Sequence, residues 1–541
     1  MGVFETLDWL MVVLYFTVIL GIAWWVIRQK QESTTDYFLA GRHVGWFIIG
    51  ASIFASNIGS EHIVGLAGTA AKTGVVMGLY ELHSWLILLL GWVFVPFYMR
   101  SMVFTMPEFL ERRYSPTARW FLSLVSLVSY VLTKVSVTVY AGAVVFQVLM
   151  GIDFWTGALI VVILTGIYTI MGGLRAVVYT ESLQAIILIL GSVIVTIIGL
   201  VKIGGWDQLV IVSGSEHFNL FLPANHPEFP WPGMVFAPPI VGLWYWCTDQ
   251  YIVQRTLAAR DEQQARRGTI FAAYLKLLPF FIFVIPGVIA FALAKTGKLE
   301  LTSADQAFPA MVKALLPTGI RGLIVGGLLA ALMSSLAAVF NSCSTLFTMD
   351  IYKKLRPQAS EKTLVRVGRV ATAVVVVSGI LWIPFMKNIS GELYHYLQSV
   401  QAYIAPPIAA VFFLGLFWSR INARGAVTTL FAGFILGMLR LIMELGKEHL
   451  SGWLYEFANL NFLYFAIFLF VFCILILIVV SLLSPKPASE KIAGLTYATT
   501  IREDKLRSRA SWNSLDVILS GLVILILIAV LVYFSPLGMT R

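Results

Sequence analysis

A small set of ionisable side chains lies inside otherwise apolar stretches of this 541-residue chain. Such groups are costly at membrane depth and are functional candidates by default. Carboxylates accept hydrogen bonds and ammonium groups donate them, so together with the amides of Gln398 and Gln401 they could hold the hydroxyls of a polar solute. The ionisable members are Glu61, His62, Glu81, His83, Lys134, Glu181, Asp249 and Lys276.

One run, from Ala55 to His62, places five polar or charged side chains and a glycine within a single apolar window. A continuous helix facing lipid does not tolerate this, so the segment is either buried or broken. A broken helix exposes backbone carbonyls, which together with Ser hydroxyls form an oxygen-only site suited to a hard monovalent cation. The pair Ser334-Ser335 could complete that site. The alternative for each single Ser or Thr is a hydrogen bond to its own helix.

The run Trp244-Tyr245-Trp246 offers aromatic faces, and Lys276 is a donor that could lie beside them. Aromatic faces pack against the C–H face of a sugar, while polar side chains bind its hydroxyls. The alternative is an aromatic belt at the membrane surface. For Glu181 and Asp249, which lie near the predicted ends of spans, solvated helix capping is an equally good reading.

The composition requires a membrane around these residues. Hydrophobic residues make up 59% of the chain and charged residues only 12%, against about 45–50% and 25% in ordinary globular proteins. The mean hydropathy is +0.86. Soluble enzymes, nucleic-acid binders and disordered chains are therefore excluded. The three cysteines, Cys247, Cys343 and Cys473, show neither metal-ligand spacing nor a disulfide framework.

A spanning helix needs about 20 mostly apolar residues, and the sequence predicts about fourteen of them. The predicted windows are 7–27, 44–70, 78–99, 119–149, 154–171, 180–202, 233–253, 268–294, 318–350, 367–386, 393–418, 425–445, 460–483 and 514–534. The loops 203–232 and 484–513 are too short for an independent core. We therefore expect the activity to take place within the membrane.

Most of the 38 Lys and Arg residues fall into one set of alternating loops. Because cytoplasmic loops are enriched in these residues, both termini are predicted to lie on the extracellular or periplasmic side. The net charge of +10 is then an orientation signal and does not indicate a nucleic-acid partner.

Five windows fall in 44–202 and five in 233–418. An odd number of spans inverts the second set relative to the first, which is a recurring plan of secondary transporters. The predicted division is an N-terminal helix and cytoplasmic loop (1–43), repeat one (44–202), an extracellular loop (203–232), repeat two (233–418) and C-terminal helices (419–541). The predicted fold class is an all-α polytopic membrane protein.

Several long strings closely resemble the sodium/glucose cotransporters of the sodium:solute symporter family, over residues 8–535. They are Gly50 to Ser60, Val64 to Gly68, Trp244 to Gln250 with Ile252 to Arg255, and Phe340 to Ser342 with Thr345 to Tyr352. The resemblance implies the LeuT-type five-plus-five inverted-repeat fold. It also implies alternating access driven by sodium, with a hexose of the glucose or galactose class as the co-transported solute and no obligate protein partner.

The resemblance also implies the site residues, position by position. The sugar site falls on Asn57, His62, Glu81, Ser84, Tyr245, Trp246, Lys276 and Gln398. The outer gate falls on Leu66, Tyr80 and Tyr394, and the inner gate on Tyr245. The sodium site falls on Ala55, Ile58, Ala331, Ser334 and Ser335, through three carbonyls and two hydroxyls.

The chain departs from the family pattern at some of these positions. Relatives that use a second sodium ion carry hydroxyls at the positions of Ala337 and Ala338 and an Asp at the position of Glu181, so we predict one sodium per sugar. Gly242 replaces a polar residue, and Leu82-His83 replaces the usual pair after Glu81. Glu61 beside His62 also occurs in inositol-transporting relatives, which keeps myo-inositol as an alternative solute.

The alternative classes of function are a membrane-embedded enzyme, a sensor and a sugar channel. A membrane-embedded enzyme needs a nucleophile or a metal cluster. Only Glu61-His62 and Glu81-Leu82-His83 come near one, and neighbouring side chains on a helix point about 100° apart. A sensor would be expected to carry a signalling domain. A sugar channel would have no need of the ion site.

Overall fold

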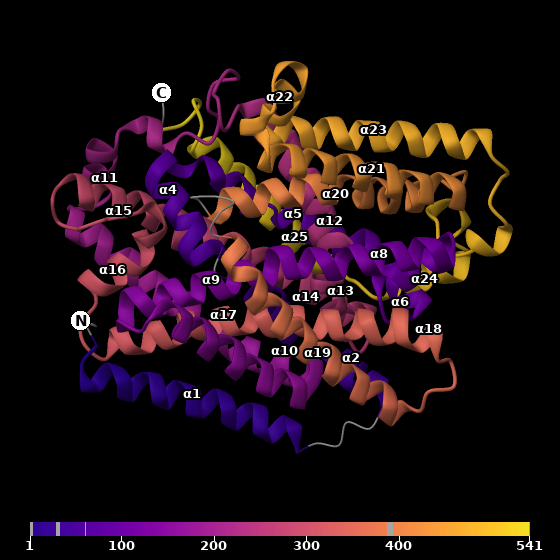
Figure 1. The fold of residues 1–541 in the computed structure, drawn as a ribbon, viewed down its shortest axis with the longest axis horizontal. Coiled ribbons are helices and arrows are strands. Elements are labelled where there is room, and N and C mark those ends of the chain that lie inside the picture. The colour runs from indigo at the N-terminus through magenta and orange to yellow at the C-terminus, as the bar shows by residue number, and fades with distance from the viewer. Residues whose placement is uncertain (1–3, 29–32, 60, 387–392, 540–541) are drawn as a thin grey trace.

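The computed structural model describes residues 4–28, 33–59, 61–386 and 393–539. Ser60, which belongs to the polar run, lies outside the described residues. Long helices run roughly side by side along one direction (Figure 1). The only β feature of the described residues is an isolated bridge between Val44 and Ala259.

The α-helices have the following bounds. They are α1 (Thr6–Ile27), α2 (Thr34–Leu39), α3 (Trp46–Asn57), α4 (Ala67–Thr73), α5 (Ser84–Leu89), α6 (Val95–Ser101), α7 (Met106–Arg113), α8 (Pro116–Ser129), α9 (Ser136–Val145), α10 (Phe154–Ile203), α11 (Trp206–Ser213), α12 (Trp231–Cys247), α13 (Gln250–Leu257), α14 (Glu262–Leu275), α15 (Ile285–Lys295), α16 (Ala307–Leu315), α17 (Ile320–Thr345), α18 (Lys353–Leu355), α19 (Glu361–Met386), α20 (Leu393–Phe417), α21 (Ala423–Leu445), α22 (Gly452–Asn459), α23 (Phe462–Leu483), α24 (Arg502–Ala510) and α25 (Ser514–Tyr533).

Short π-helical and 3-10 segments interrupt or join these helices. The π-helical segments are Glu61–Leu66, Leu90–Phe94, Tyr130–Val135, Phe146–Met150, Phe280–Val284 and Leu346–Tyr352. The 3-10 segments are Ala40–Arg42, Gly74–Tyr80, Ser215–Phe218, Ala304–Gln306, Lys447–His449, Ser489–Lys491 and Tyr497–Thr499.

Every predicted window overlaps a helix. By length and composition, eleven helical segments within the described part of the chain are long and apolar enough to cross a membrane. Two further apolar helices, Trp46–Asn57 and Phe154–Ile167, are shorter. The protein is therefore a multi-pass membrane protein, and the number fourteen remains a prediction.

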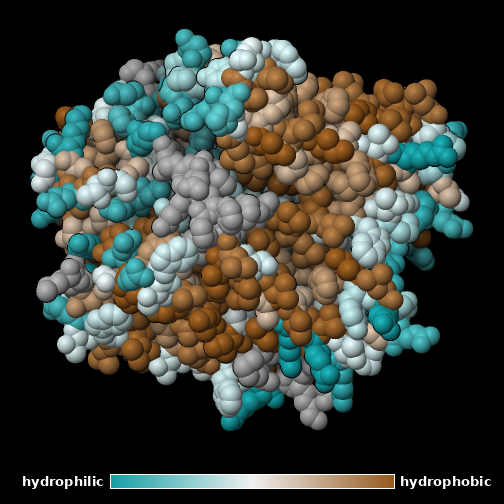
Figure 2. All heavy atoms as spheres, in the orientation of Figure 1, coloured by the Kyte–Doolittle hydropathy of each residue, from teal (hydrophilic) through white to brown (hydrophobic). Residues whose placement is uncertain are grey.

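Large apolar side chains cover the outside of the bundle. Leu10 and Val13 on α1 and Ile518 and Leu525 on α25 are about 60% exposed. Figure 2 shows hydrophobic residues over the middle of the visible face and hydrophilic residues towards its two ends. Lipid is the solvent that such a surface requires.

The first helix of each predicted repeat is broken. In the first, α3 ends at Asn57, the backbone of Ile58 is extended, and helical structure resumes at Glu61. In the second, α12 ends at Cys247 and α13 begins at Gln250. The polar run predicts a segment that is either buried or broken, and its described residues are both.

Two predicted spans, 154–171 and 180–202, both lie in α10, which consists of two helices separated by a sharp kink. Gly173 at the kink has a φ of 55°, and a Cβ there would lie 2.6 Å from the backbone oxygen of Tyr37. Only glycine fits this conformation and this contact.

The peripheral helix α1 is attached to α17 by a buried ion pair. Asp8 accepts hydrogen bonds from the backbone of Gly319 and Gly322 and pairs with Arg321. The start of α1 and the end of α25 lie at the same end of the bundle (Figure 1).

Candidate functional site

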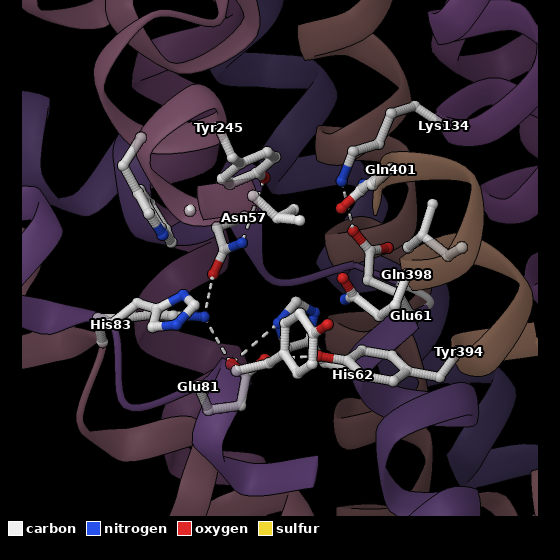
Figure 3. Close-up of a pocket in the computed structure, with 16 residues that line it drawn as sticks. Asn57, Glu61, His62, Glu81, His83, Lys134, Tyr245, Tyr394, Gln398 and Gln401 are labelled. Carbon is white, nitrogen blue, oxygen red and sulfur yellow. Dashed lines mark hydrogen bonds and ion pairs between the residues drawn. The ribbon is translucent and has the colours of Figure 1, made fainter. Parts of the chain in front are cut away.

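A polar cavity of about 40 Å³ lies inside the bundle, next to the break after α3 (Figure 3). This volume is well below the roughly 300–1,000 Å³ that is typical of small-molecule sites, so a solute of that size enters only if the lining side chains move apart. Its lining residues are Asn57, Glu61, His62, Tyr80, Glu81, His83, Lys134, Val241, Gly242, Tyr245, Trp246, Lys276, Tyr394, Leu397, Gln398 and Gln401.

Glu81 is the centre of a hydrogen-bonded cluster on one wall of the cavity. Its Oε2 lies 2.5 Å from Lys276 Nζ and 3.1 Å from His62 Nε2, and its Oε1 accepts from the Tyr394 hydroxyl at 3.1 Å. Lys276 also donates to Asn57 Oδ1 at 2.9 Å. The buried charges are thus paired, and each retains hydrogen-bonding capacity for a solute.

Interrupted backbone positions the members of this cluster. Asn57 is the last residue of α3, and His62 lies in the first turn of the π-helical segment after the break. Glu81 follows the 3-10 segment Gly74–Tyr80, and Lys276 follows α14. Because these residues lie at the ends of helical segments, their side chains converge on one point from separate parts of the chain.

The aromatic run lies in the core, since Trp244, Tyr245 and Trp246 are all buried. The alternative of an interfacial belt is therefore wrong. Asn57 donates to the Tyr245 hydroxyl at 3.2 Å. Lys134 Nζ lies 4.8 Å from the centre of the Tyr245 ring, and Lys276 Nζ lies 5.2 Å from that of Trp246. Each ring thus has an ammonium group over one of its faces.

Of the three residues expected to form the outer gate, two line the cavity and the third does not. Tyr80 and Tyr394 line the cavity and their rings meet edge to face, with centroids 6.4 Å apart. Leu66 and Ser84 are buried but are absent from the cavity lining. The Oγ of Ser84 has no hydrogen-bond partner among the described residues.

The predicted sodium ligands converge beside the cavity. Ser334 Oγ donates to Ala331 O at 2.9 Å and lies 3.2 Å from Ala55 O. Ser335 Oγ lies 3.3 Å from Ser56 O in α3 and 3.4 Å from Ile58 O, which lies within the helix break. The side chains of these two serines therefore contact the α3 segment. Ser342, by contrast, donates a hydrogen bond to its own helix, which is the alternative stated above for single Ser and Thr residues. The set comprises oxygen atoms only, which suits a hard cation.

The departures at Gly242 and His83 are related in space. A Cβ at Gly242 would lie 2.9 Å from His83 Nδ1 and 2.4 Å from a methyl group of Leu86. The imidazole of His83 thus occupies the space that a side chain at position 242 would need. A polar group is retained at this point of the wall, but it comes from the residue that precedes α5.

Glu181 and Asp249 are not the solvated caps that one reading expected, because both are buried. Glu181 Oε1 lies 2.9 Å from Arg255 Nη2, and its other oxygen accepts from Ser52. Arg255 Nε also lies 3.2 Å from Ser52 Oγ. Asp249 does cap α13, but it does so in the protein core, where it also accepts from Tyr130.

The cavity includes residues that sequence reasoning did not assign to the solute site. Lys134 lies 3.0 Å from Glu61 Oε1, and both line the cavity beside Gln401 (Figure 3). A charge within an apolar window was the available signal for Lys134. For Gln401, the signal was its position about one turn after Gln398 on the same helix.

Comparison with known proteins identifies the family. The model of the sodium:solute symporter family matches residues 37–437. The chain belongs to this family. It is 40% identical over 526 residues to sodium/glucose cotransporter 1 of Ovis aries, covering 88% of this chain and 79% of that protein.

Other family members are similarly close. Sodium/myo-inositol cotransporter 2 of Oryctolagus cuniculus is 38% identical over 551 residues, covering 93% of this chain and 80% of that protein. Among solved structures, a sodium-coupled sialic acid symporter in a substrate-bound outward-open state is 22% identical with a TM-score of 0.76, covering 89% of this chain and 98% of that chain. The fold is thus the LeuT-type inverted-repeat fold, and sodium is the co-transported ion of the family.

Proposed function

We propose that this symporter imports a neutral hexose of the glucose or galactose class with one sodium ion per sugar, by alternating access. The observation that carries the proposal is the Glu81–Lys276 cluster, which faces the cavity directly beside a cage of oxygen atoms. The lining carboxylates Glu61 and Glu81 are balanced by Lys134 and Lys276. A charge-balanced cavity favours an uncharged solute with many hydroxyls.

In this proposal Asn57, His62, Glu81, Lys276 and Gln398 bind the hydroxyls of the sugar. Gln398 is well suited, because its Oε1 is buried in the lining with no partner among the described residues. Tyr245 closes the inner side beside Trp246, and Tyr80 and Tyr394 close the outer side with Leu66. Ser84 has a weaker claim because it lies outside the cavity lining.

Sodium would bind to the carbonyls of Ala55, Ile58 and Ala331 and to the hydroxyls of Ser334 and Ser335. An ion held there connects α3 to α17 and fixes the break that carries Asn57 and His62. Sodium thereby orders the sugar site, and transport follows if the loaded state differs in affinity between outward and inward conformations.

A single sodium ion is supported by the surroundings of Glu181. This carboxylate forms an ion pair with Arg255. The guanidinium group neutralises its negative charge, so a second sodium ion is not needed there. Ala337 and Ala338 on α17 offer no hydroxyl. One charge moving through 100 mV contributes about 2.3 kcal/mol, and a tenfold sodium gradient about 1.4 kcal/mol, which together sustain several hundredfold accumulation.

The proposal also includes the orientation of the chain in the membrane, its division into two repeats and the absence of a required protein partner. Both termini face the extracellular or periplasmic side of the cell membrane, 44–202 and 233–418 are the two repeats, and neither catalysis nor a protein partner is needed. Myo-inositol is the second candidate solute, because a relative named as a sodium/myo-inositol cotransporter is 38% identical to this chain.

Uptake into proteoliposomes tests the function. Labelled glucose, galactose, mannose and myo-inositol are compared with and without an inward sodium gradient, in the wild type and in Gln398→Ala. We expect sodium-dependent uptake of a hexose that the variant loses. Preference for myo-inositol selects the second candidate, and sodium-independent flux would support a channel instead. Reversal potentials that gave two sodium ions per sugar would refute the stoichiometry.

A further inference from the structure

A second buried ion pair lines the cavity, separate from Glu81–Lys276. Lys134 Nζ lies 3.0 Å from Glu61 Oε1, and the two side chains are only 6% and 3% exposed. Figure 3 shows the pair beside Gln401, on the other side of the cavity from His83. Both residues belong to π-helical segments, Glu61–Leu66 and Tyr130–Val135. Such distortions of a helix are frequent at functional sites.

Glu61 also borders the proposed sodium ligands. A Cβ placed on Gly59 would lie 2.6 Å from Glu61 Oε2 and 2.7 Å from Ser335 Oγ, so one added carbon would touch both oxygens. Ser335 Oγ in turn lies 3.4 Å from Ile58 O. The two oxygens of one carboxylate thus have different neighbours. Oε1 pairs with Lys134, whereas Oε2 and the Oγ of Ser335 both border the space beside Gly59.

This arrangement makes two cations compete for one buried carboxylate. A sodium ion beside Ser335 is attracted by Glu61 and repelled by the ammonium group of Lys134. At separations of a few ångströms inside a protein, solvent and salt screen such charges little. Removing Glu61 and removing Lys134 must therefore act on sodium affinity in opposite directions.

We propose that Glu61 and Lys134 are the positioning residues that couple sodium binding to solute binding. A solute hydroxyl that accepts a hydrogen bond from Lys134 draws the ammonium group away from Glu61. The negative charge of the carboxylate is then neutralised less by Lys134 and stabilises sodium more strongly, and by linkage sodium strengthens solute binding to the same degree. The solute class that this requires is a neutral ring with a hydroxyl at the edge facing Lys134. The inference rests on the proposed function and adds a route of coupling to it.

The test measures the sodium concentration for half-maximal uptake in the full-length protein in proteoliposomes, together with the solute KM at saturating sodium. Coupling between sites is typically five- to 150-fold. Glu61→Gln is expected to raise the sodium half-saturation at least about fivefold and Lys134→Met to lower it at least about fivefold. The double variant is expected to fall between them. Lys134→Arg keeps the charge and should stay closer to the wild type than Lys134→Met.

Asp8→Asn is the matched control, because Asp8 and Arg321 form a buried pair outside the cavity lining. Its sodium half-saturation should equal that of the wild type. Shifts of the same sign in Glu61→Gln and Lys134→Met, or no shift in either, would overturn the proposal and leave the pair a structural role only.

A second readout separates this proposal from the proposed function. Sodium that binds the folded state raises the melting temperature, and this needs no transport. The sodium concentration that produces half of the shift should move in the same opposite directions in Glu61→Gln and Lys134→Met. If the wild type transported none of the solutes tested, the function would be wrong, while these melting shifts would still decide whether Glu61 and Lys134 control sodium affinity.

Discussion

Lys276→Met removes the ammonium group that joins the two halves of the proposed sugar site. Lys276 Nζ lies 2.5 Å from Glu81 Oε2 and 2.9 Å from Asn57 Oδ1, and the side chain is buried. Met keeps a similar length and an apolar stem, so the change removes a charge and three hydrogen-bond donors with little change of shape.

The cost to folding is limited by the partners that Glu81 keeps. Removing one member of a buried ion pair costs about 3–5 kcal/mol when the other charge is left uncompensated. Here Glu81 still has His62 Nε2 at 3.1 Å and the Tyr394 hydroxyl at 3.1 Å. We therefore expect a destabilisation smaller than that range, so that the variant still folds and reaches the membrane.

Lys276→Met should weaken solute binding strongly. A hydrogen bond from a charged donor contributes about 1.5–3 kcal/mol, which corresponds to a rise in solute KM of about ten- to 150-fold. The assay is the initial rate of sodium-driven uptake against solute concentration, normalised to the amount of protein in the vesicles.

Two further variants of this chain make the result interpretable. Lys313→Met removes a lysine from an exposed position of α16 and should leave the KM unchanged. Lys276→Arg keeps the positive charge and should bind the solute better than Lys276→Met. If Lys276→Met transported with the KM of the wild type, Lys276 would not contact the solute and the site would have to be placed elsewhere.

Three further outcomes follow from the structure. Ser335→Ala removes one proposed sodium ligand, and the loss of about 1.5 kcal/mol should raise the sodium half-saturation about tenfold, measured by uptake at saturating solute. Gly242→Ala should lower the melting temperature in detergent, because its Cβ meets His83 and Leu86 and overpacking costs about 1–3 kcal/mol; adding His83→Ala should restore part of the loss. Burial raises the pKa of Glu111, but hydrogen bonds from Lys354 and Arg119 outweigh this and hold the pKa below its ordinary value of 4.5. Its contribution to stability is thus present above about pH 4.5 and lost as the pH falls through the lowered pKa, so the melting temperatures of the wild type and Glu111→Gln should converge in that acid range.

The local pattern of apolar and polar residues was sufficient to predict the positions of most helices. Long apolar windows predicted helices where the structure has them, because a helix that crosses lipid must satisfy its backbone internally and expose apolar side chains along its length. The polar run from Ala55 to His62 predicted a buried or broken segment for the same reason, and the structure shows the break after α3. The windows 154–171 and 180–202 were likewise predicted as separate helices, and the kink at Gly173 divides α10 between them.

The site was predictable only in part. The residue types at positions 57, 62, 81 and 276 indicated hydrogen bonding to a polar solute, and the family resemblance supplied their grouping. The second pair, Glu61 with Lys134, was visible as two isolated charges, but nothing in the sequence joined them. The same holds for Glu181, which was expected near the end of a span, and Arg255, because no prediction joined the two.

By itself, the sequence determined that this is a membrane protein, which segments form its long apolar helices and which polar run cannot face lipid, because these depend on the solvent preference of residues close together in the chain. Only the tertiary structure decided which charges neutralise each other. Glu81 and Lys276 are 195 residues apart and Glu61 and Lys134 are 73 apart. Their pairing depends on how separate helices pack, as does the filling of the space at Gly242 by His83, and packing between distant segments leaves no local periodicity in the chain.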